Sequence, residues 1–236
     1  MGLLDRRGFN LIILVDGDVV AYRAAFSKEG EPLEDAKEKV DGLMDDISFD
    51  TTSRGEAMEV YLTGKGNFRY DISPTYKANR KDTPRPEHLT DLRSYLVDEY
   101  DAVVSQGQEA DDLIAIRATE LAYDCTIVSP DKDFKQIPCR HYNPSKAEWS
   151  VVGEFEALQF FYSQILTGDR ADNVEGIYGI GPIKSKRILS DATTEEELYA
   201  KVLEAYEGNE ELVVMNARLL WLRRKEDELW QPPHQR

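Results

Sequence analysis

The sequence predicts an α/β fold, with a mostly parallel central sheet flanked by helices and a helical part after it. Up to about residue 150, short apolar runs of strand length alternate with amphipathic segments. The first run, LIILV at 11–15, is continuously apolar, as expected for a strand buried on both faces. Beyond Trp149 the apolar spacing becomes helical. We therefore expect an α/β region over 1–150 and a helical region over 151–236.

The elements of the first region follow in order. Asp18 can cap a helix that runs to about Ser27, and Pro86 suits the first turn of a helix ending near Tyr100. DKDFKQI, from Asp131, indicates a loop or helical turn. The segment 64–85 mixes glycine, proline, aromatic and basic residues with little periodicity, so we expect an irregular loop. The further strands are predicted at 57–63, 102–104 and 125–129, and the further helices at 33–49 and 109–121.

The second region reads as helices joined by turns. FEALQFFYSQILTG predicts a helix that ends at Gly168, and Pro182 can open another that extends through Leu189. Further helices are expected at 195–206 and 209–229. Glycines at 176, 179 and 181 predict a tight turn before Pro182.

Composition narrows the class of protein. With 41% hydrophobic residues, a chain of 236 residues can bury a substantial core. No apolar run approaches the length of a transmembrane helix, and the N-terminal segment lacks a signal-peptide cleavage site. Arg6 stands where a myristoylation signal needs Ser or Thr. Cys125 and Cys139 form no CxxC pair, so we expect reduced cysteines and a cytoplasmic protein. We also expect a monomer without a membrane association.

The charge is strongly acidic but uneven. A net charge of −16 argues against a uniformly basic nucleic-acid binder. Between Thr63 and Pro86, however, six basic residues stand against two acidic ones, and KSKR at 184–187 is a second basic island. The two basic segments could therefore still bind a polyanionic ligand.

Carboxylates recur where predicted strands end. Carboxyl ends of parallel strands meet at one sheet edge, so these side chains are expected to converge. The set comprises Asp16, Glu109, Asp111, Asp112, Asp131 and Asp133, with Asp169 and Asp172 further along the chain. Favourable interaction with a helix dipole would account for Glu109 alone, but not for the whole set. Magnesium prefers oxygen ligands, and two such ions roughly 4 Å apart can activate water and stabilise a leaving oxygen in phosphodiester cleavage.

Two basic segments could hold the substrate. FRYDISPTYKANRK at 68–81 interleaves rings with cations, which can stack on bases and neutralise phosphates. The alternative there is a solvated charged loop. In GIYGIGPIKSKRIL at 176–189, turn N–H groups beside Lys184, Lys186 and Arg187 predict a helix–hairpin–helix that contacts a DNA backbone. The alternative there is an ordinary connection between helices.

Together these motifs resemble the flap endonuclease family of 5′-nucleases, which have a PIN-like core, and especially stand-alone phage 5′→3′ exonucleases. LVDGD, FRYDISPTYKANR, GQEADDLIA, SPDKDFKQI and TGDRADNVEGIYGIGPIKSKRIL occur in the family's order between about residues 11 and 190. The resemblance implies a Mg²⁺- or Mn²⁺-dependent nuclease with two ions and a helix–hairpin–helix type motif that also carries K⁺. Its expected partner is DNA with 5′ ends or flaps, or RNA in RNA–DNA hybrids.

The resemblance also implies roles for individual residues. Asp16, Glu109, Asp111 and Asp131 would hold the first ion, Asp112 and Asp133 would be close or water-linked, and Asp169 and Asp172 would hold the second ion. Lys77 and Arg80 would bind the scissile phosphate from a helical arch at 64–85. The expected catalytic residues are Lys77, Arg80, Asp16 and Asp111. Tyr76 would stack on a base and Arg23 would contact phosphate. The remaining expected DNA contacts are Arg69, Gly179, Gly181, Lys184 and Lys186.

One position departs from the family pattern. Many members carry an aspartate after the second strand, whereas this chain has Thr63 and Gly64. Either a metal ligand is lost or Thr63 acts from the outer shell of the site.

Two other functions are compatible with parts of the sequence. ILVDGDVV matches the nucleophile motif of haloacid-dehalogenase-like phosphatases, with Asp16 as nucleophile and Asp18 as general acid. That interpretation leaves the hairpin and YKANR unused. The second alternative, suggested by Thr63, is a catalytically weakened DNA-binding relative. The acidic helices after residue 190 have no predicted role.

Overall fold

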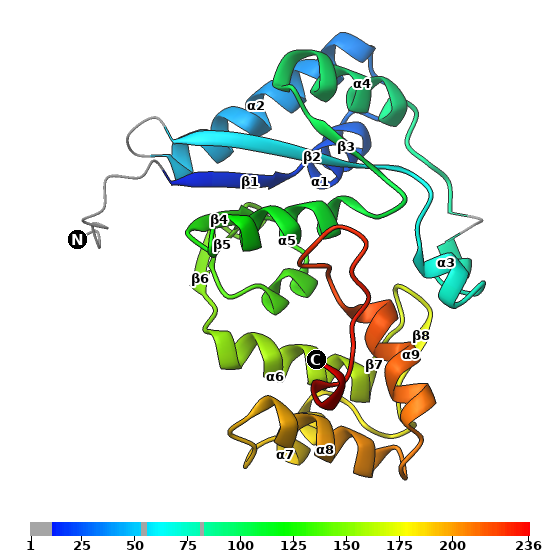
Figure 1. Cartoon of the computed structure of the whole chain (residues 1–236). Coiled ribbons are helices and arrows are strands. Elements are labelled where there is room, and N and C mark those ends of the chain that lie inside the picture. The colour runs from blue at the N-terminus through cyan, green and yellow to red at the C-terminus, as the bar shows by residue number, and fades with distance from the viewer. Residues whose placement is uncertain (1–10, 53–55, 81–82) are drawn as a thin grey trace.

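A twisted sheet with helices on both faces forms the upper part of the molecule, and helices form the lower part (Figure 1). The structure, a computed structural model, describes residues 11–52, 56–80 and 83–236. The segment 1–10, in which the sequence argued against a signal peptide and myristoylation, lies outside the described residues, as do Lys81 and Asp82. Along the described residues the helices and strands are β1 (Ile12–Asp16), α1 (Gly17–Ser27), α2 (Leu33–Thr51), β2 (Ala57–Lys65), α3 (Arg69–Ile72), η1 (Ala78–Arg80), α4 (Leu89–Tyr100), β3 (Val103–Gln106), α5 (Ala110–Glu120), β4 (Cys125–Val128), η2 (Lys132–Gln136), β5 (Arg140–Asn143), β6 (Glu148–Val151), α6 (Glu154–Thr167), β7 (Gly168–Asp169), β8 (Val174–Glu175), α7 (Pro182–Ile188), α8 (Glu195–Ala205), α9 (Glu210–Leu220) and η3 (Pro233–Gln235).

The main sheet has the order β3-β2-β1-β4-β5-β6. Strands β1 to β5 run parallel, and β6 returns antiparallel beside β5. The predicted α/β class, with a mostly parallel sheet, is confirmed. Because β1 lies between β2 and β4, the residues that follow β1, β2, β3 and β4 share one sheet edge.

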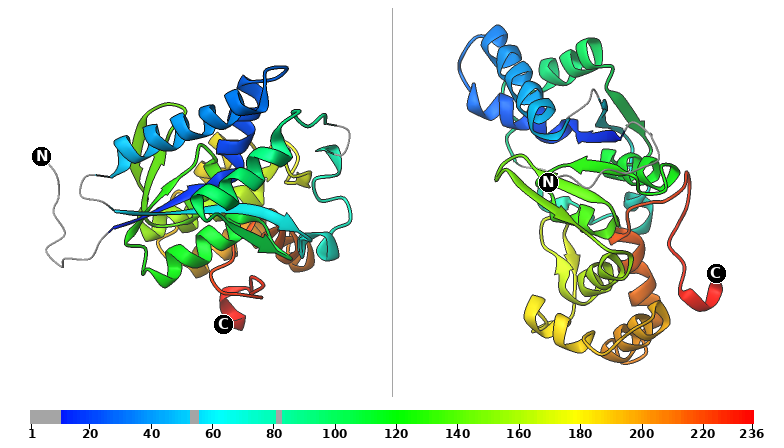
Figure 2. Two further views of the ribbon diagram at one scale, coloured as in Figure 1. Left: turned by 90° about the horizontal axis from the view of Figure 1, so that it is seen from above. Right: turned by 90° about the vertical axis from the view of Figure 1, so that its left-hand side faces the viewer.

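Helices α1, α2 and α4 pack together on one face of the sheet, and α5 packs on the other (Figures 1 and 2). The apolar side of α2 is buried through residues such as Val40, Leu43 and Ile47, which gives the helix its 3.6-residue pattern. The two free cysteines, Cys125 and Cys139, are buried. Among the described helices, none is long and apolar enough to cross a membrane.

A second hydrophobic core joins α6, α8 and α9 below the sheet. Phe161, Tyr162 and Trp230 are buried in it, and their rings contact one another. After α9 the chain returns toward the sheet, where Leu222 packs in the core beneath α5. This C-terminal return packs residues of the helical region against the α/β region. The boundary near residue 150 stays a prediction.

The structure corrects several predicted elements. Asp16, rather than Asp18, caps α1, since its carboxylate accepts the Val19 N–H at 3.2 Å. Helix α4 begins at Leu89, so Pro86 precedes it by a turn. Helix α9 ends at Leu220 instead of extending to 229. The hairpin of β5 and β6 was not predicted, because its strands carry few apolar residues.

Candidate functional site

The carboxylates predicted from strand ends do gather at one edge of the sheet. Asp16 ends β1, Asp111 lies in the first turn of α5, and Asp131 caps η2 after β4. Burial raises the pKa of Asp111 well above its usual range, and the charges of Asp16, Glu109 and Asp131 raise it further. The convergence expected from the parallel topology is therefore present, with the repulsion that it entails.

Asp16 and Asp131 are joined by Ser129, a residue that the sequence reasoning missed. The Ser129 hydroxyl donates to Asp16 at 2.8 Å and accepts the Asp131 N–H at 3.0 Å. Burial raises the pKa of Asp16 to about 6, while the Ser129 hydrogen bond opposes that rise. The clue in the sequence was the Ser-Pro-Asp order directly after a strand, which places a hydroxyl between two carboxylates.

A second group of carboxylates comes from the loop between β7 and β8. Asp169 accepts the N–H groups of Ala171 and Asp172, so the two aspartates share a tight loop. Gly168 has φ +67°, and a Cβ there would lie 2.3 Å from the Gly176 nitrogen. Only glycine fits this approach of β7 to β8, which fixes where Asp169 and Asp172 point.

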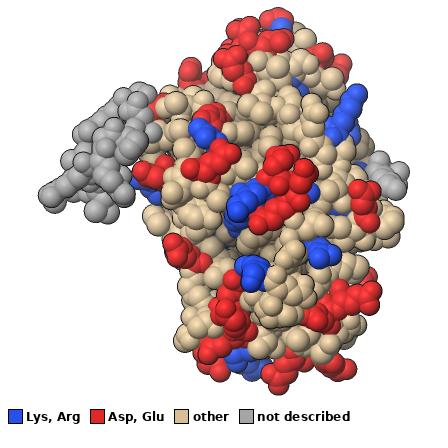
Figure 3. Space-filling view, viewed as in Figure 1, with Lys and Arg blue, Asp and Glu red and all other residues tan. Residues whose placement is uncertain are grey.

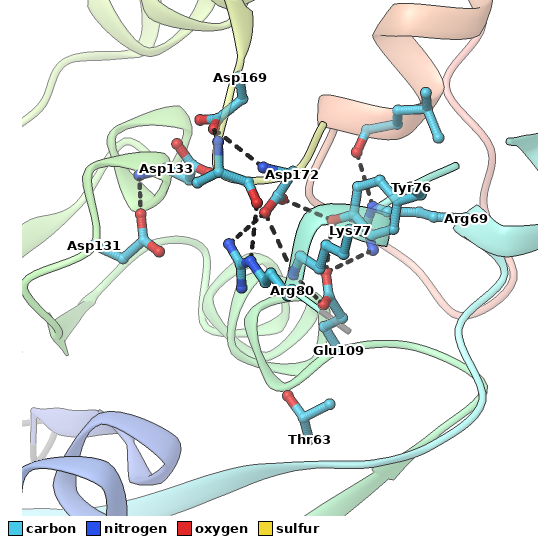
Figure 4. Close-up of polar contacts among 12 residues, drawn as sticks. Thr63, Arg69, Tyr76, Lys77, Arg80, Glu109, Asp131, Asp133, Asp169 and Asp172 are labelled. Carbon is cyan, nitrogen blue, oxygen red and sulfur yellow. Dashed lines mark hydrogen bonds and ion pairs between the residues drawn. The ribbon is translucent and has the colours of Figure 1, made fainter. Parts of the chain in front are cut away.

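Cations from the chain itself lie among these carboxylates (Figure 4). Lys77 pairs with Glu109 and lies 3.7 Å from Asp172, and Arg80 donates to Asp172 at 2.6 Å. Lys132, which the sequence reasoning missed, pairs with Asp169 and donates to Asp133 at 3.1 Å. Lys77 and Arg80 thus both lie near the Asp172 carboxylate; Arg80 ends the 3-10 turn η1, and Lys77 directly precedes that turn.

Residues 75–80 of the arch segment are hydrogen-bonded to the loop that carries Asp172. Lys77 has φ +53°, an uncommon backbone conformation for a side-chain-bearing residue. Its N–H donates to the Asp172 carbonyl at 2.9 Å, and the Arg80 side chain donates to the Ala171 carbonyl at 2.9 Å. Residues 75–80 are therefore held against the loop that carries Asp172.

Tyr76 has a different environment from the expected one. Its side chain is 2% exposed, and its hydroxyl oxygen lies 3.0 Å from a Glu109 carboxylate oxygen and 2.8 Å from one of Asp172, so the two carboxylates share a single hydroxyl proton. A ring buried in this way cannot stack on a base. The structure instead places Tyr76 as a bridge between the two groups of carboxylates.

Asp112 and Arg69 also differ from their expected roles. Both are buried, and the Arg69 guanidinium grips the Asp112 carboxylate at 2.6 and 2.8 Å. Burial alone would raise the pKa of Asp112, but Arg69 holds it below the usual value. With both oxygens engaged, Asp112 is not free to ligate a metal, and Arg69 is not available to DNA.

The departure at 63–64 has a physical explanation. The Thr63 hydroxyl accepts the Ala110 N–H at 3.0 Å, so it caps the helix that carries Asp111. Gly64 lies where β2 passes β3, and a Cβ there would meet the Ser105 carbonyl oxygen at 1.8 Å. An aspartate at 64 would therefore clash, whereas Thr63 supports the site from outside.

The remaining expected DNA contacts lie on the surface. Arg23, on α1, is exposed and donates to the Pro144 carbonyl at 3.4 Å. Gly179, Gly181, Lys184 and Lys186 are also exposed. On the face drawn in Figure 3, acidic side chains gather at the top, over α2 and α4, at the centre beside basic side chains, and at the bottom. Helix α7 itself carries basic side chains and no acidic one.

The donor set suits a divalent cation. Among the described residues, no three Asp, Glu, His or Cys side chains are drawn together closely enough to form a ready-made metal site. In Figure 4, Asp131 and Asp133 lie on one side of Asp172 and Glu109 on the other, with side-chain cations between them. Burial raises the pKa of Asp133 to about 6, and the charge of Asp131 contributes. Hard divalent cations prefer carboxylate oxygens as ligands, and a cation bound here would offset the repulsion that raises these pKa values.

Comparisons with known proteins identify the family. A family model described as the 5′-3′ exonuclease N-terminal resolvase-like domain matches residues 11–157. The flap endonuclease Xni of Aeromonas hydrophila is 30% identical over 183 residues, which cover 67% of this chain and 68% of that protein. DNA polymerase I of Deinococcus radiodurans is 28% identical over 209 residues, which cover 80% of this chain. The chain spans only about a fifth (21%) of that polymerase and 60% of the Xni protein of Vibrio cholerae, which is 33% identical over 157 residues.

Solved structures share the fold. The flap endonuclease of bacteriophage T5, in a complex with DNA and metal ions, has a TM-score of 0.70 at 19% identity, covering 89% of this chain and 88% of that one. The catalytic core of Rad2 with a DNA substrate has a TM-score of 0.54 at 13% identity, covering 95% and 83%. These likenesses establish a PIN-like 5′-nuclease fold and remove the haloacid-dehalogenase alternative, in which Asp18 would act as an acid. Asp18 instead pairs with Arg93 and accepts the Thr63 N–H at 2.9 Å. The chain belongs to the 5′-3′ exonuclease family, by its match to the N-terminal resolvase-like domain and by its fold.

Proposed function

We propose that this protein is a divalent-metal-dependent 5′-nuclease that hydrolyses phosphodiester bonds at or near 5′ ends of duplex or flapped DNA. The observation that carries the proposal is the meeting of carboxylates from strand ends with Lys77 and Arg80 from the arch. Carboxylates alone would repel a phosphate backbone, so a nucleic-acid site built from them needs bound cations. Relatives named flap endonucleases support the same activity.

Two groups of carboxylates could hold two ions, Mg²⁺ or Mn²⁺. Asp16, Glu109, Asp111 and Asp131 form the first group; Asp169 and Asp172, with Asp133 nearby, form the second. Ions bound there would supply an activated water and stabilise the leaving oxygen. The chain's own residues would set the geometry, because Ser129 holds Asp16 against Asp131 and Tyr76 links Glu109 to Asp172.

In this proposal Lys77 and Arg80 bind the scissile phosphate. Burial would lower the pKa of Lys77, but the charges of Glu109 and Asp172 raise it above its usual value, so the amine stays charged. A phosphate oxygen arriving beside Asp172 could accept from either cation in place of a carboxylate. Positive charge fixed beside the reacting phosphate offsets the charge that develops in the transition state.

Duplex binding would fall to the hairpin and its helix. The exposed Gly179 and Gly181 leave the backbone accessible, and Lys184 and Lys186 add charge for phosphates. A potassium ion at this hairpin and cleavage of RNA in hybrids belong to the same proposal. Substituting Lys184 and Lys186 together by alanine should weaken duplex binding and flatten its salt dependence without changing cation affinity.

The deciding experiment uses 5′-labelled flap, blunt duplex, RNA–DNA hybrid and single-stranded substrates, with Mg²⁺, with Mn²⁺ and with EDTA. The wild-type protein should cleave flap or duplex DNA from the 5′ end only with the cation, and Asp111→Asn should not cleave. Absence of cleavage on every substrate would reject the enzyme.

Thr63 and Gly64 support a second candidate, a DNA-binding relative with weakened catalysis, because a carboxylate common in the family is absent here. Binding to flap DNA in Ca²⁺ without cleavage in Mg²⁺ or Mn²⁺ would favour that function.

A further inference from the structure

The end of α9 and the chain that follows it contact the first turn of α5, the turn that carries Glu109 and Asp111. This C-terminal brace, residues 219–226, lies beyond the part of the chain matched by the family model. Its contacts are buried, and they reach the carboxylate site through Arg69, Asp112 and Gln108.

Arg69 is the centre of these contacts. Its side chain is 1% exposed, and its guanidinium donates to the Leu219 carbonyl at 2.9 Å and the Trp221 carbonyl at 2.8 Å. The same group holds both oxygens of Asp112 and lies 3.6 Å from Glu109. One planar side chain therefore ties the foot of the arch and the start of α5 to the end of α9.

The brace also reaches α5 directly. Asp112 accepts the backbone N–H of Arg223 at 3.2 Å and that of Glu109 at 3.1 Å. The Arg223 side chain, 5% exposed, donates to the Gln108 side chain at 3.0 Å. Gln108 in turn donates to Glu226 at 3.2 Å.

The Phe68 ring contacts both Arg69 and Arg223. The Arg223 guanidinium lies 3.7 Å from the centre of the Phe68 ring, and that of Arg69 lies 4.5 Å from it. Phe68 directly precedes the arch helix α3, so the brace contacts both the arch and α5. A displacement of the brace would move both together.

A gain in the free energy of folding does not by itself explain why Arg69 and Asp112 are buried as a pair. A buried ion pair is often no more stabilising than apolar residues of similar volume, because both charges lose their hydration. A forked guanidinium does fix the distance and orientation of its carboxylate. A shift of about 1 Å in a reacting group can cost 100-fold in rate, so fixing the first turn of α5 matters to the carboxylates on it.

We propose that the C-terminal brace positions the first turn of α5, and that Arg69 and Arg223 are positioning residues for the cation-binding carboxylates Glu109 and Asp111. The inference rests on the proposed function for its catalytic meaning. The mechanical part, a brace that holds the turn, is independent of that function.

The test compares two arginines near the end of α9. Arg223→Met removes the contacts to Gln108 and Phe68. Arg218→Met is the control, because Arg218 lies outside the brace and its side chain donates to the Trp230 carbonyl at 3.2 Å. Arg69→Lys keeps a charge beside Asp112 but cannot form the fork, and it avoids leaving the carboxylate unpaired.

Two measurements without DNA separate positioning from general destabilisation. Hydrogen exchange at the amides of Asp112 and Leu113 should become at least about tenfold faster in Arg223→Met and Arg69→Lys, while the amides of β4 keep their protection. Mn²⁺ binding followed by electron paramagnetic resonance should weaken about tenfold in both variants. Arg218→Met should match the wild type in each measurement.

Wild-type exchange and Mn²⁺ affinity in both Arg223→Met and Arg69→Lys would overturn the brace, whatever the activity of the protein. Faster exchange throughout β4 as well would also overturn it, since the effect would then be global. If the wild type binds no Mn²⁺, the proposed metal-dependent function fails, and amide exchange still decides whether the brace holds α5.

Discussion

The Thr63 hydroxyl accepts the backbone N–H of Ala110 at 3.0 Å, which joins the end of β2 to the start of α5. The bond lies at the position where this chain departs from the pattern expected from the family resemblance. It satisfies a helix N–H that otherwise has no partner within the helix. Thr63 therefore contributes to the site through the position of Asp111.

Replacing Thr63 by valine should lower the free energy of unfolding by about 1 kcal/mol, the usual effect of losing a helix-capping bond. Thr63→Ser keeps the hydroxyl and should lose less than half as much. Urea unfolding of the two variants makes the comparison. Equal stability of valine and serine variants would show that the bond does not hold α5.

Gly64 should tolerate no side chain. A Cβ at this position would meet the Ser105 carbonyl oxygen at 1.8 Å, so Gly64→Ala should destabilise the protein by about 3 kcal/mol through forced movement of β3. Gly42, inside α2, is the control because nothing lies within 4 Å of a Cβ there. Gly42→Ala should stabilise the protein by about 0.5–1 kcal/mol. Denaturation curves in which the two variants shift alike would contradict the clash.

Asp111→Asn should abolish cleavage and yet raise the thermal stability of the metal-free protein. Burial and the charges of Asp16 and Glu109 raise the pKa of Asp111, which means that the folded state disfavours its ionised form at pH 7. Removing that charge relieves the penalty, and each kcal/mol gained moves the midpoint by about 2–4 °C. Addition of Mg²⁺ should then stabilise the wild type more than the variant, as calorimetry would show. A lower midpoint for the metal-free variant would contradict the repulsion.

Tyr76→Phe distinguishes a bridging hydroxyl from a stacking ring. Phenylalanine could still stack on a base, but it cannot donate to Glu109 and Asp172. Hydrogen bonds to charged groups contribute about 1.5–3 kcal/mol, so the metal-free variant should lose about that much stability. Tyr70→Phe is the matched control, since Tyr70 is about half exposed and its ring touches that of Tyr76. Matching unfolding curves for both variants would exclude the bridging role.

Much of the fold could be predicted because its strongest signals are local. The buried run at β1 and the apolar stripe of α2 follow directly from periodicity, and carboxylates at successive strand ends had to meet once the strands were parallel. Burial of charge could not be predicted in the same way. The sequence predicts Arg69 as a DNA contact, because its actual partner, Asp112, lies 43 positions away and no local pattern indicates that the two residues pair.

The end of α9 was misplaced for a related reason. Residues 221–229 are rich in charged side chains that suit an exposed helix, so the predicted helix continued to 229. In the structure Trp221 leaves the helix and Arg223 turns toward Phe68 and Gln108, so tertiary contacts override a modest local preference. The sequence reasoning missed two residues of the site, Ser129 and Lys132. Both lie close in sequence to predicted carboxylates, but their hydrogen bonds depend on the direction of their side chains, which the sequence does not show.

His141 should make stability fall at mildly acidic pH. Burial lowers its pKa below the usual 6.5, and its Nε2 lies 2.9 Å from the Ile137 carbonyl in the core under β5. The unfolded chain therefore binds a proton at a higher pH than the folded chain does. The contribution of His141 is complete above pH 6.5 and is lost as the pH falls through the folded pKa, with a slope of at most about 1.4 kcal/mol per pH unit. Asp16 and Asp133, whose pKa values are raised to about 6, give the opposite slope below pH 6. Their effect cancels when wild type and His141→Gln are compared at each pH without divalent cations. The stability advantage of wild type over the variant should shrink between pH 7 and pH 5, and an advantage that stays constant over this range would show that His141 takes up its proton equally well in both states.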